Sequence, residues 1–127
     1  MDIAPTLLNI ANDAHPQKRD GKEILAMQGK SMLTCWTDEK NSIRSNKDHL
    51  AWELLGWKAV RMGDWKATWL SPPFGHSKWQ LFNFKSDPGE AMDLSSENPD
   101  KLQTMIRIYE NYVEHCGVKE SLREIDM

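Results

Sequence analysis

The sequence has 127 residues, a length that suits one domain with a core of its own. Charged residues make up 28% of it and hydrophobic residues 39%, a balance typical of a globular, soluble chain. The net charge of −3 argues against a nucleic-acid partner, because such partners require a basic surface. No apolar run approaches the roughly 20 residues of a membrane span, so no membrane partner is expected.

The start of the sequence carries no basic segment followed by an apolar one. No secretory signal is therefore predicted, and a cytoplasmic location is the default expectation. The two cysteines, Cys35 and Cys116, lie far apart in the sequence and have unlike neighbours. Two thiols do not make a disulfide framework, so both are expected to be reduced and partly buried.

Residues 1–12 are predicted to form a helix. Asp2 is a good N-cap residue, and Pro5 falls in the first turn, where its missing N–H costs least. Apolar residues recur at helical spacing on one side: Ile3, Leu7, Leu8 and Ile10. We expect this apolar face to be buried against another part of the protein or against a partner.

Residues 13–49 are rich in Asn, Asp, Gly and Pro and are predicted to be mostly loop. A short apolar segment at residues 30–36 is compatible with a helix. The polar residues 37–48 are expected to form an exposed loop.

Residues 50–84 are predicted to form an antiparallel sheet. Apolar and polar residues alternate through most of this stretch, and a period of two indicates strands with one buried face. Gly63 can supply the positive φ of a tight turn, and Asp64 tolerates it. Four of the six tryptophans fall here and are expected to supply the main buried mass: Trp52, Trp57, Trp65 and Trp69.

Residues 98–116 are predicted to form a helix, with Asn98 as N-cap, Pro99 in the first turn and Gly117 as the stop. One apolar stripe runs along it: Leu102, Met105, Ile106, Tyr109 and Val113. The order helix, loop, strands, helix predicts an α+β fold in one domain, residues 1–127. A small antiparallel sheet of about four strands is packed by the C-terminal helix, and the N-terminal helix is free to pack on a partner.

The segment Asp87-Pro88-Gly89-Glu90 is predicted to be a turn in which Pro88 sets φ and Gly89 takes a positive φ. Asp87, Glu90 and Asp93 are spaced by three, and oxygen ligands of calcium can have this spacing. The alternative is a turn and a cap with solvated charge, and we favour it.

Three further groups of residues could form a site or could have ordinary structural roles. The histidines are scattered and form no pair at helical spacing, so a zinc site is not expected: His15, His49, His76 and His115. A basic group on the predicted hairpin could bind an anion or form a solvated strand face: Lys58, Arg61 and Lys66. Nothing in the sequence places together the two carboxylates of a hypothetical acid/base pair: Glu53 and Asp64.

Indole rings on a sheet can form a platform that binds sugars, and Trp57 with Trp79 is the candidate pair. The alternative, which we favour, is that the tryptophans form the core and a docking surface. Coplanar and exposed rings would support the sugar hypothesis.

Three segments follow one another in a distinctive order: DIAPTLLNIA, WELLGWKAVRMGDWKATWL and WQLFNFKSDPGEAMDL, before the capped helix. Together they resemble the C-terminal subdomain of bacterial arylsulfatases, in the sulfatase branch of the alkaline-phosphatase superfamily. The resemblance runs from about Asp2 to about Val118, and its more specific parts are Gly63 to Lys66 and Asp87 to Leu94. It implies a small antiparallel sheet packed by a helix, beside a much larger α/β domain.

The family uses calcium and a formylglycine made from the Cys or Ser of a Cys/Ser-x-Pro-x-Arg motif. The candidate that begins at Cys35 has Thr37 where proline belongs and Glu39 where arginine belongs, and the one at Cys116 fails at both places. The family's calcium ligands and its catalytic His and Lys residues lie upstream of anything here. We therefore expect no catalytic residue, no metal ligand and no cofactor in this chain.

Two hypotheses follow from the resemblance. In the first, the chain is a sulfatase C-terminal subdomain that is structural and inactive alone; whether the chain has any enzymatic activity of its own stays open. In the second, it is a stand-alone binding module for a carbohydrate or for a sulfatase catalytic part. Because an uncovered apolar face seldom stays bare, we also expect a two-fold homodimer in which the opening helix lies in the contact.

Overall fold

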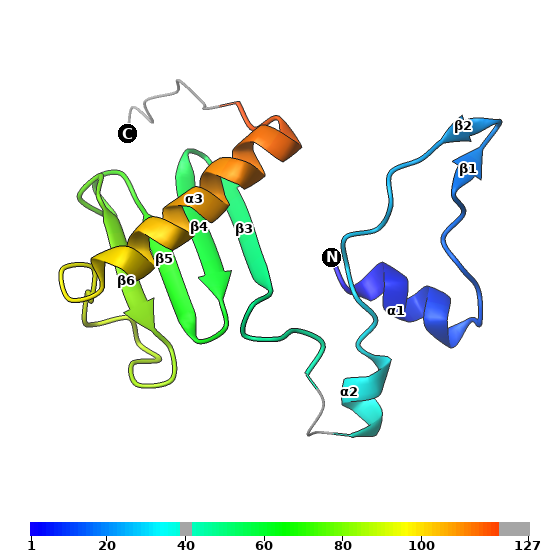
Figure 1. The fold of residues 1–127 in the computed structure, drawn as a ribbon, viewed down its shortest axis with the longest axis horizontal. Helices are drawn as coiled ribbons and strands as arrows, with labels where there is room; N and C mark the ends of the chain where they lie inside the picture. Colours follow the sequence, from blue (N-terminus) through cyan, green and yellow to red (C-terminus); the bar gives the residue numbers. More distant parts are fainter. Residues whose placement is uncertain (39–41, 120–127) are drawn as a thin grey trace. The chain divides into compact units, whose positions relative to one another are not determined.

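The computed structural model describes residues 1–38 and 42–119 (Figure 1). The chain divides into two compact units, Met1–Ser45 and Asn46–Met127, which are described one at a time. The single domain expected over residues 1–127 stays a prediction.

The first unit contains two short helices and a small hairpin: α1 (Ile3–Ile10), β1 (Lys18–Arg19), β2 (Lys22–Glu23) and α2 (Leu33–Thr37). The hairpin lies in the stretch predicted to be loop. Its turn residues, Asp20 and Gly21, have φ angles of 52° and 77°, as a two-residue type I′ turn requires. Strands of two residues are too short to show alternation, which is why the sequence pattern did not reveal them.

Polar contacts hold the first turn of α1 to the rest of its unit. Asp2 occupies the N-cap position, but its carboxylate makes no capping bond and instead accepts the Lys30 N–H at 3.0 Å. The same carboxylate accepts two bonds from the Arg44 guanidinium, at 2.6 and 2.7 Å. Thr6 is 1% exposed; its hydroxyl donates to the Asp2 carbonyl and accepts the Met32 N–H.

The second unit is a four-stranded antiparallel sheet crossed on one face by a long helix (Figure 1). The strands lie in chain order: β3 (His49–Leu54), β4 (Trp57–Met62), β5 (Trp65–Trp69) and β6 (Trp79–Asn83). The helix is α3 (Pro99–Cys116). The predicted α+β fold, with its sheet and its C-terminal helix, is confirmed.

The turns of the sheet depend on a few residues with positive φ. Gly63 joins β4 to β5 with a φ of 58°, as predicted, and a Cβ there would lie 3.2 Å from the Asn46 amide oxygen. After Pro88 the prediction is wrong, because the positive φ belongs to Glu90 (54°) and not to Gly89. The Glu90 N–H donates to the Asp87 carbonyl, and a type I turn closed this way keeps both central residues at negative φ.

The core lies between the middle of the sheet and α3. Its buried residues are Val60, Ala67, Leu81, Met105 and Tyr109. The expectation that the indoles supply the main buried mass is wrong: none of the tryptophans is fully buried, and Trp65 and Trp79 pack against the margin of the core. An indole is wide enough that it is rarely buried completely, and narrower side chains, including the Tyr109 ring, occupy the centre.

The buried stripe of α3 centres on Met105 and Tyr109. Four further residues pack against the core: Leu102, Ile108, Tyr112 and Val113. Ile106, which was predicted to belong to the stripe, is half-buried and lies outside the core cluster. The stripe is thus turned toward Ile108 and Tyr112, a rotation that apolar spacing alone did not reveal.

Candidate functional site

The face of the sheet turned away from α3 is the main candidate site. Because successive side chains point to opposite faces, the neighbours of the core residues Val60, Ala67 and Leu81 point away from the helix. Together with β3 they line a cavity of about 390 Å³. We call this surface the open face, and define it by Trp52, Leu54, Trp57, Ala59, Thr68 and Phe82.

The open face has a buried floor and an exposed apolar rim. Ala59, Thr68 and Phe82 are buried, whereas Trp52 and Leu54 on β3 are 41% and 60% exposed. The Trp57 indole is fixed, because its N–H donates to the Ser71 hydroxyl at 3.1 Å and the Phe74 ring meets it edge-on with centroids 5.1 Å apart. A rim of this kind favours contact with another apolar surface.

One ion pair lies beside the open face. The Lys66 ammonium is 2.6 Å from a Glu90 carboxylate oxygen, and both side chains are mostly covered. The two charges cancel, so this pair neither attracts nor repels a charged partner. The open face can therefore bind an apolar surface or stack against a ring.

The predicted basic group does not converge. Arg61 and Lys66 are direct neighbours across β4 and β5, and both flank the Phe84 ring. The Lys58 ammonium lies on the α3 side of the sheet, 5.0 Å from the Trp69 ring. The prediction that the three cations lie near each other is therefore wrong for Lys58, because the strand period sends it to the opposite face.

The predicted tryptophan platform does not form either. Trp79 lies on the α3 side and meets the Tyr109 ring edge-on, with centroids 5.5 Å apart. Trp57 lies on the open face, so the two rings are on opposite sides of the sheet. Trp52 is the indole that shares the open face with Trp57.

Two of the carboxylates considered from the sequence, Glu53 and Asp87, accept hydrogen bonds from backbone N–H groups. The Glu53 carboxylate accepts the Gly56 N–H at 2.7 Å, in the turn between β3 and β4. Asp64 lies in the turn at the other end of β4, so the two carboxylates are not brought together. The Asp87 carboxylate accepts the Met92 N–H at 2.8 Å.

Asp93 closes the outer edge of β6. Its carboxylate accepts the N–H groups of Leu81 (3.0 Å) and Ser95 (2.9 Å), while the Leu94 N–H donates to the Leu81 carbonyl. Burial raises the pKa of Asp93, but these N–H donors outweigh it and the net pKa lies below the ordinary value. The carboxylates at positions 87, 90 and 93 thus have separate partners and do not converge on a cation.

The histidines are also apart from one another. The His15 imidazole lies 3.1 Å from the Leu25 carbonyl in the first unit, and the other three are exposed on separate parts of the second: His49, His76 and His115. Across residues 1–38 and 42–119, no three His, Cys, Asp or Glu side chains are grouped so that they could hold a metal ion.

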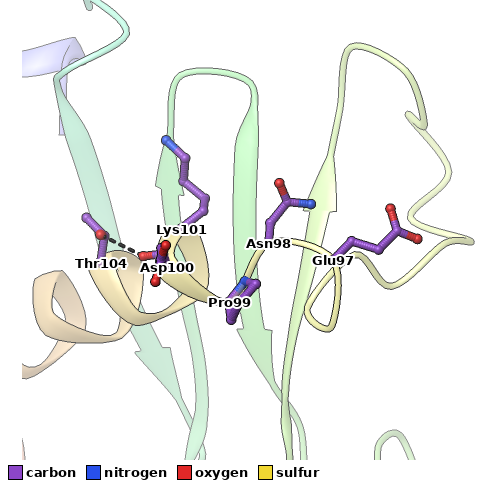
Figure 2. A pocket seen from close by; sticks show the side chains of 6 residues that line it. All are labelled: Glu97, Asn98, Pro99, Asp100, Lys101 and Thr104. Atoms are coloured by element: carbon purple, nitrogen blue, oxygen red, sulfur yellow. Dashed lines mark hydrogen bonds between the residues drawn. The ribbon is translucent and has the colours of Figure 1, made fainter.

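A second hollow, of about 440 Å³, lies at the start of α3 (Figure 2). It is lined by polar residues, and the Thr104 hydroxyl donates to the Asp100 carbonyl beside it. The two carboxylates Asp100 and Glu97 outnumber the Lys101 ammonium at this helix end, so the charge of the lining opposes the anion that the N–H groups of a helix start attract. We assign no ligand to this hollow.

Comparison with known proteins identifies the fold. No protein-family model matches the chain. Its sequence is 31% identical over 119 residues to an uncharacterised sulfatase of Schizosaccharomyces pombe, and the match takes in 93% of this chain. The chain is a sulfatase homologue. It spans about a fifth of that relative, since the match covers 21% of the relative's length.

Solved structures give the same result for the fold. The sulfatase homologue superposes on Ps i-CgsB, solved with k-i-k-neocarrahexaose, with a TM-score of 0.61 and 26% identity, over 87% of this chain and 23% of that one. For BT1596, a 2-O GAG sulfatase, the TM-score is 0.61 and the identity 19%, over 96% and 27% of the two chains. This coverage is consistent with the C-terminal subdomain that the sequence resembles.

The two cysteines of the sulfatase homologue are free thiols in unlike places. Cys35 is half-buried in α2, and Cys116 is exposed at the end of α3, where a partly buried thiol was expected. Glu39, which stands where the arginine of the sulfatase motif belongs, and Glu120, its counterpart after Cys116, lie outside the described residues.

No helix in the described part of the chain is long and apolar enough to cross a membrane.

Proposed function

We propose that this sulfatase homologue acts as the non-catalytic C-terminal subdomain of a sulfatase, and that its open face rests against the catalytic part. The observation that carries the proposal is the share of the match: 93% of this chain corresponds to 21% of a sulfatase. Most of a sulfatase lies outside the matched length, and we assign the family's chemistry to that part.

The open face supports this role. The helix α3 covers one side of the sheet, and the other side presents the exposed Trp52 and Leu54 above a buried floor. A sheet with one apolar side uncovered gains free energy when a second layer packs on it, at about 25 cal/mol per Å² of apolar surface removed from water. The catalytic part of a sulfatase is the layer we propose.

The carboxylates and Cys35 of this chain do not fit calcium and formylglycine, the two groups that the family's chemistry requires. The carboxylates at positions 87, 90 and 93 are used by a backbone N–H, a lysine and two further N–H groups. Thr37, the second residue after Cys35, stands where the motif's proline belongs. In this proposal calcium and formylglycine belong to the catalytic part, and this chain shapes or stabilises that part.

The test combines activity with binding. The pure chain should hydrolyse no aryl sulfate, and it should bind the Schizosaccharomyces pombe sulfatase from which the matching segment has been removed, as measured by calorimetry. Trp52→Ala should weaken this binding about tenfold, because an exposed indole that becomes buried in an interface can contribute more than about 1 kcal/mol. Trp36→Ala is the matched control, since Trp36 is an exposed indole of the first unit.

Two results would contradict the proposal. Aryl sulfate hydrolysis by the pure chain that disappears in Cys35→Ala would assign it a catalytic role. Equal losses of binding in Trp52→Ala and Trp36→Ala would show that the open face is not the surface that makes the contact.

A second candidate function is that of a saccharide-binding module. Trp52 and Trp57 share the open face with Thr68 and Gln80, a combination of rings and hydrogen-bonding groups that suits a sugar. A similar fold occurs in BT4656, solved with D-glucosamine-2-N,6-O-disulfate, at a TM-score of 0.58 and 18% identity over 89% of this chain and 23% of that one. Heat of binding with this saccharide that disappears in Trp52→Ala would favour the module.

A further inference from the structure

The two edge strands of the four-stranded sheet differ in whether their outward backbone groups are hydrogen-bonded. At β6 the backbone of Leu81 is engaged by Asp93 and Leu94, so this edge is closed. At the other edge β3 ends the strand order of the sheet in the described part of the chain. Its six residues, HLAWEL, include no proline and no lysine, the residues that commonly protect an edge from pairing.

The geometry of the hairpin determines which backbone groups of β3 point outward. A two-residue turn, Leu55–Gly56, joins β3 to β4, so the flanking pair Leu54 and Trp57 is of the hydrogen-bonded kind. Hydrogen-bonded pairs alternate along a ladder. The N–H and C=O groups of every second residue therefore point away from β4, and these residues are His49, Ala51 and Glu53.

We propose that two copies of this chain pair antiparallel along β3, with Ala51 opposite its own copy. Directly opposed residues must point to the same face, and both must direct their backbone groups to the shared edge. Centring on Ala51 meets both conditions and keeps five residues of each strand in register. It places His49 opposite Glu53 of the other copy, on both sides of the two-fold axis.

Side-chain chemistry favours this register. A basic imidazole faces a carboxylate twice, and Leu50 faces the Trp52 indole of the other copy on the second face of the sheet. Centring on Trp52 instead would place Glu53 opposite Ala51 and leave His49 without a partner in the strand. Self-complementarity of the side chains, with an imidazole opposite a carboxylate and Leu50 opposite Trp52, is the argument for a second copy as the occupant, because a two-fold contact pairs each residue with its complement.

The closed edge of β6 limits the assembly to two copies. A sheet with unpaired backbone groups at both edges could pair with further copies at each edge. In this chain the bonds of Leu81 to Asp93 and Leu94 occupy the β6 edge, so only the β3 edge can pair. The two sheets then form one continuous sheet with α3 of each copy on the same side. The contact reaches the open faces only at their β3 margin, where Leu50 meets Trp52 of the other copy, and leaves the rest of each face uncovered. It therefore goes beyond the proposed function and does not depend on it.

The first test is a charge exchange at the paired positions, measured by sedimentation equilibrium. His49→Glu places two carboxylates opposite each other twice and should raise the dimer dissociation constant about tenfold. Adding Glu53→His to this variant restores unlike pairs and should recover most of the affinity. His76→Glu makes the same chemical change at an exposed histidine outside the sheet and should leave the constant unchanged.

The second test is cross-linking in a Cys35→Ser/Cys116→Ser background. Ala51→Cys should form an intermolecular disulfide, because the Cα atoms of a hydrogen-bonded pair lie about 5.5 Å apart, within the range of a disulfide. Leu54→Cys is the control, since the register separates the two copies of this residue by about 20 Å along the strands.

Each contrary result would overturn the proposal. These results are a monomer at all concentrations, a dimer that His49→Glu leaves intact, or cross-linking at position 54 and not at 51. The expected contact through α1 is tested in parallel with Leu7→Asp: a dimer lost in this variant but kept in His49→Glu would assign the contact to α1 instead. Circular dichroism of every variant verifies that the sheet is folded.

Discussion

At the scale of single residues, the informative side chains are carboxylates that accept backbone N–H groups. Asp2 links α1 to Lys30 and Arg44, and Asp93 closes β6. Sequence spacing suggested a helix cap for the first and, for the second, a turn and cap with solvated charge in preference to a calcium ligand. Lys30 and Arg44 lie 28 and 42 residues from Asp2, and Leu81 lies 12 residues from Asp93, too far for local spacing to indicate them. The presence of the Asp-Pro-Gly-Glu turn, by contrast, was predictable, because its residues act on neighbours, although the positive φ belongs to Glu90 and not to Gly89.

The Asp2 carboxylate should make the first unit sensitive to acid. The Arg44 guanidinium is the main cause that lowers its pKa from 3.8 to about 2, against an opposing effect of burial and with help from the Lys30 N–H. A depressed pKa gives stability that is complete above 3.8 and is lost as the pH falls through about 2. Protection of the α1 amides from hydrogen exchange should therefore decline across this interval.

Asp2→Asn provides the comparison. It should lower the stability of the first unit by about 1 kcal/mol at neutral pH and remove the acid dependence. Glu23→Gln takes a carboxylate from the exposed strand β2 and should behave as the unchanged protein. An α1 whose protection has the same acid profile with and without Asp2 would contradict the assignment.

At the scale of elements, alternation and capping predicted β3 to β6 and α3, because in both cases the buried side repeats along a regular backbone. The same patterns could not give the rotation of α3, which depends on how its side chains fit over the sheet. They also could not assign Lys58 and Trp57 to their faces, because a face is assigned only when the register is known. The residues of the open face follow from the register in which the strands pair.

The rotation of α3 gives a direct prediction. Met105 is fully buried, so Met105→Ala should destabilise the second unit by about 2–5 kcal/mol through lost contacts and a cavity. Gln103→Ala, at an exposed position of the same helix, should stay within about 0.5 kcal/mol of the unchanged protein. Urea unfolding measures both values. Equal effects at the two positions would show that the stripe is placed wrongly.

At the scale of the whole molecule, the resemblance to sulfatases was available from ordered segments of the sequence, and its fold is present. The division into two units was not predicted. The polar contacts within residues 1–45 involve Asp2, Thr6 and Arg44, none of which forms part of an apolar pattern. Apolar periodicity predicts apolar cores. A unit held by polar hydrogen bonds has little apolar periodicity, so its sequence pattern does not predict it.

The distribution of tryptophan makes the intrinsic fluorescence of the chain depend mainly on the second unit. Five of the six indoles belong to the second unit, and the remaining one, Trp36, is 62% exposed in the first. Its emission should therefore change little when its surroundings unfold, whereas half-buried rings such as Trp65 and Trp79 pass from a packed environment into water. Intrinsic fluorescence of this chain is thus a built-in reporter of the sheet and α3, and it leaves α1 unseen.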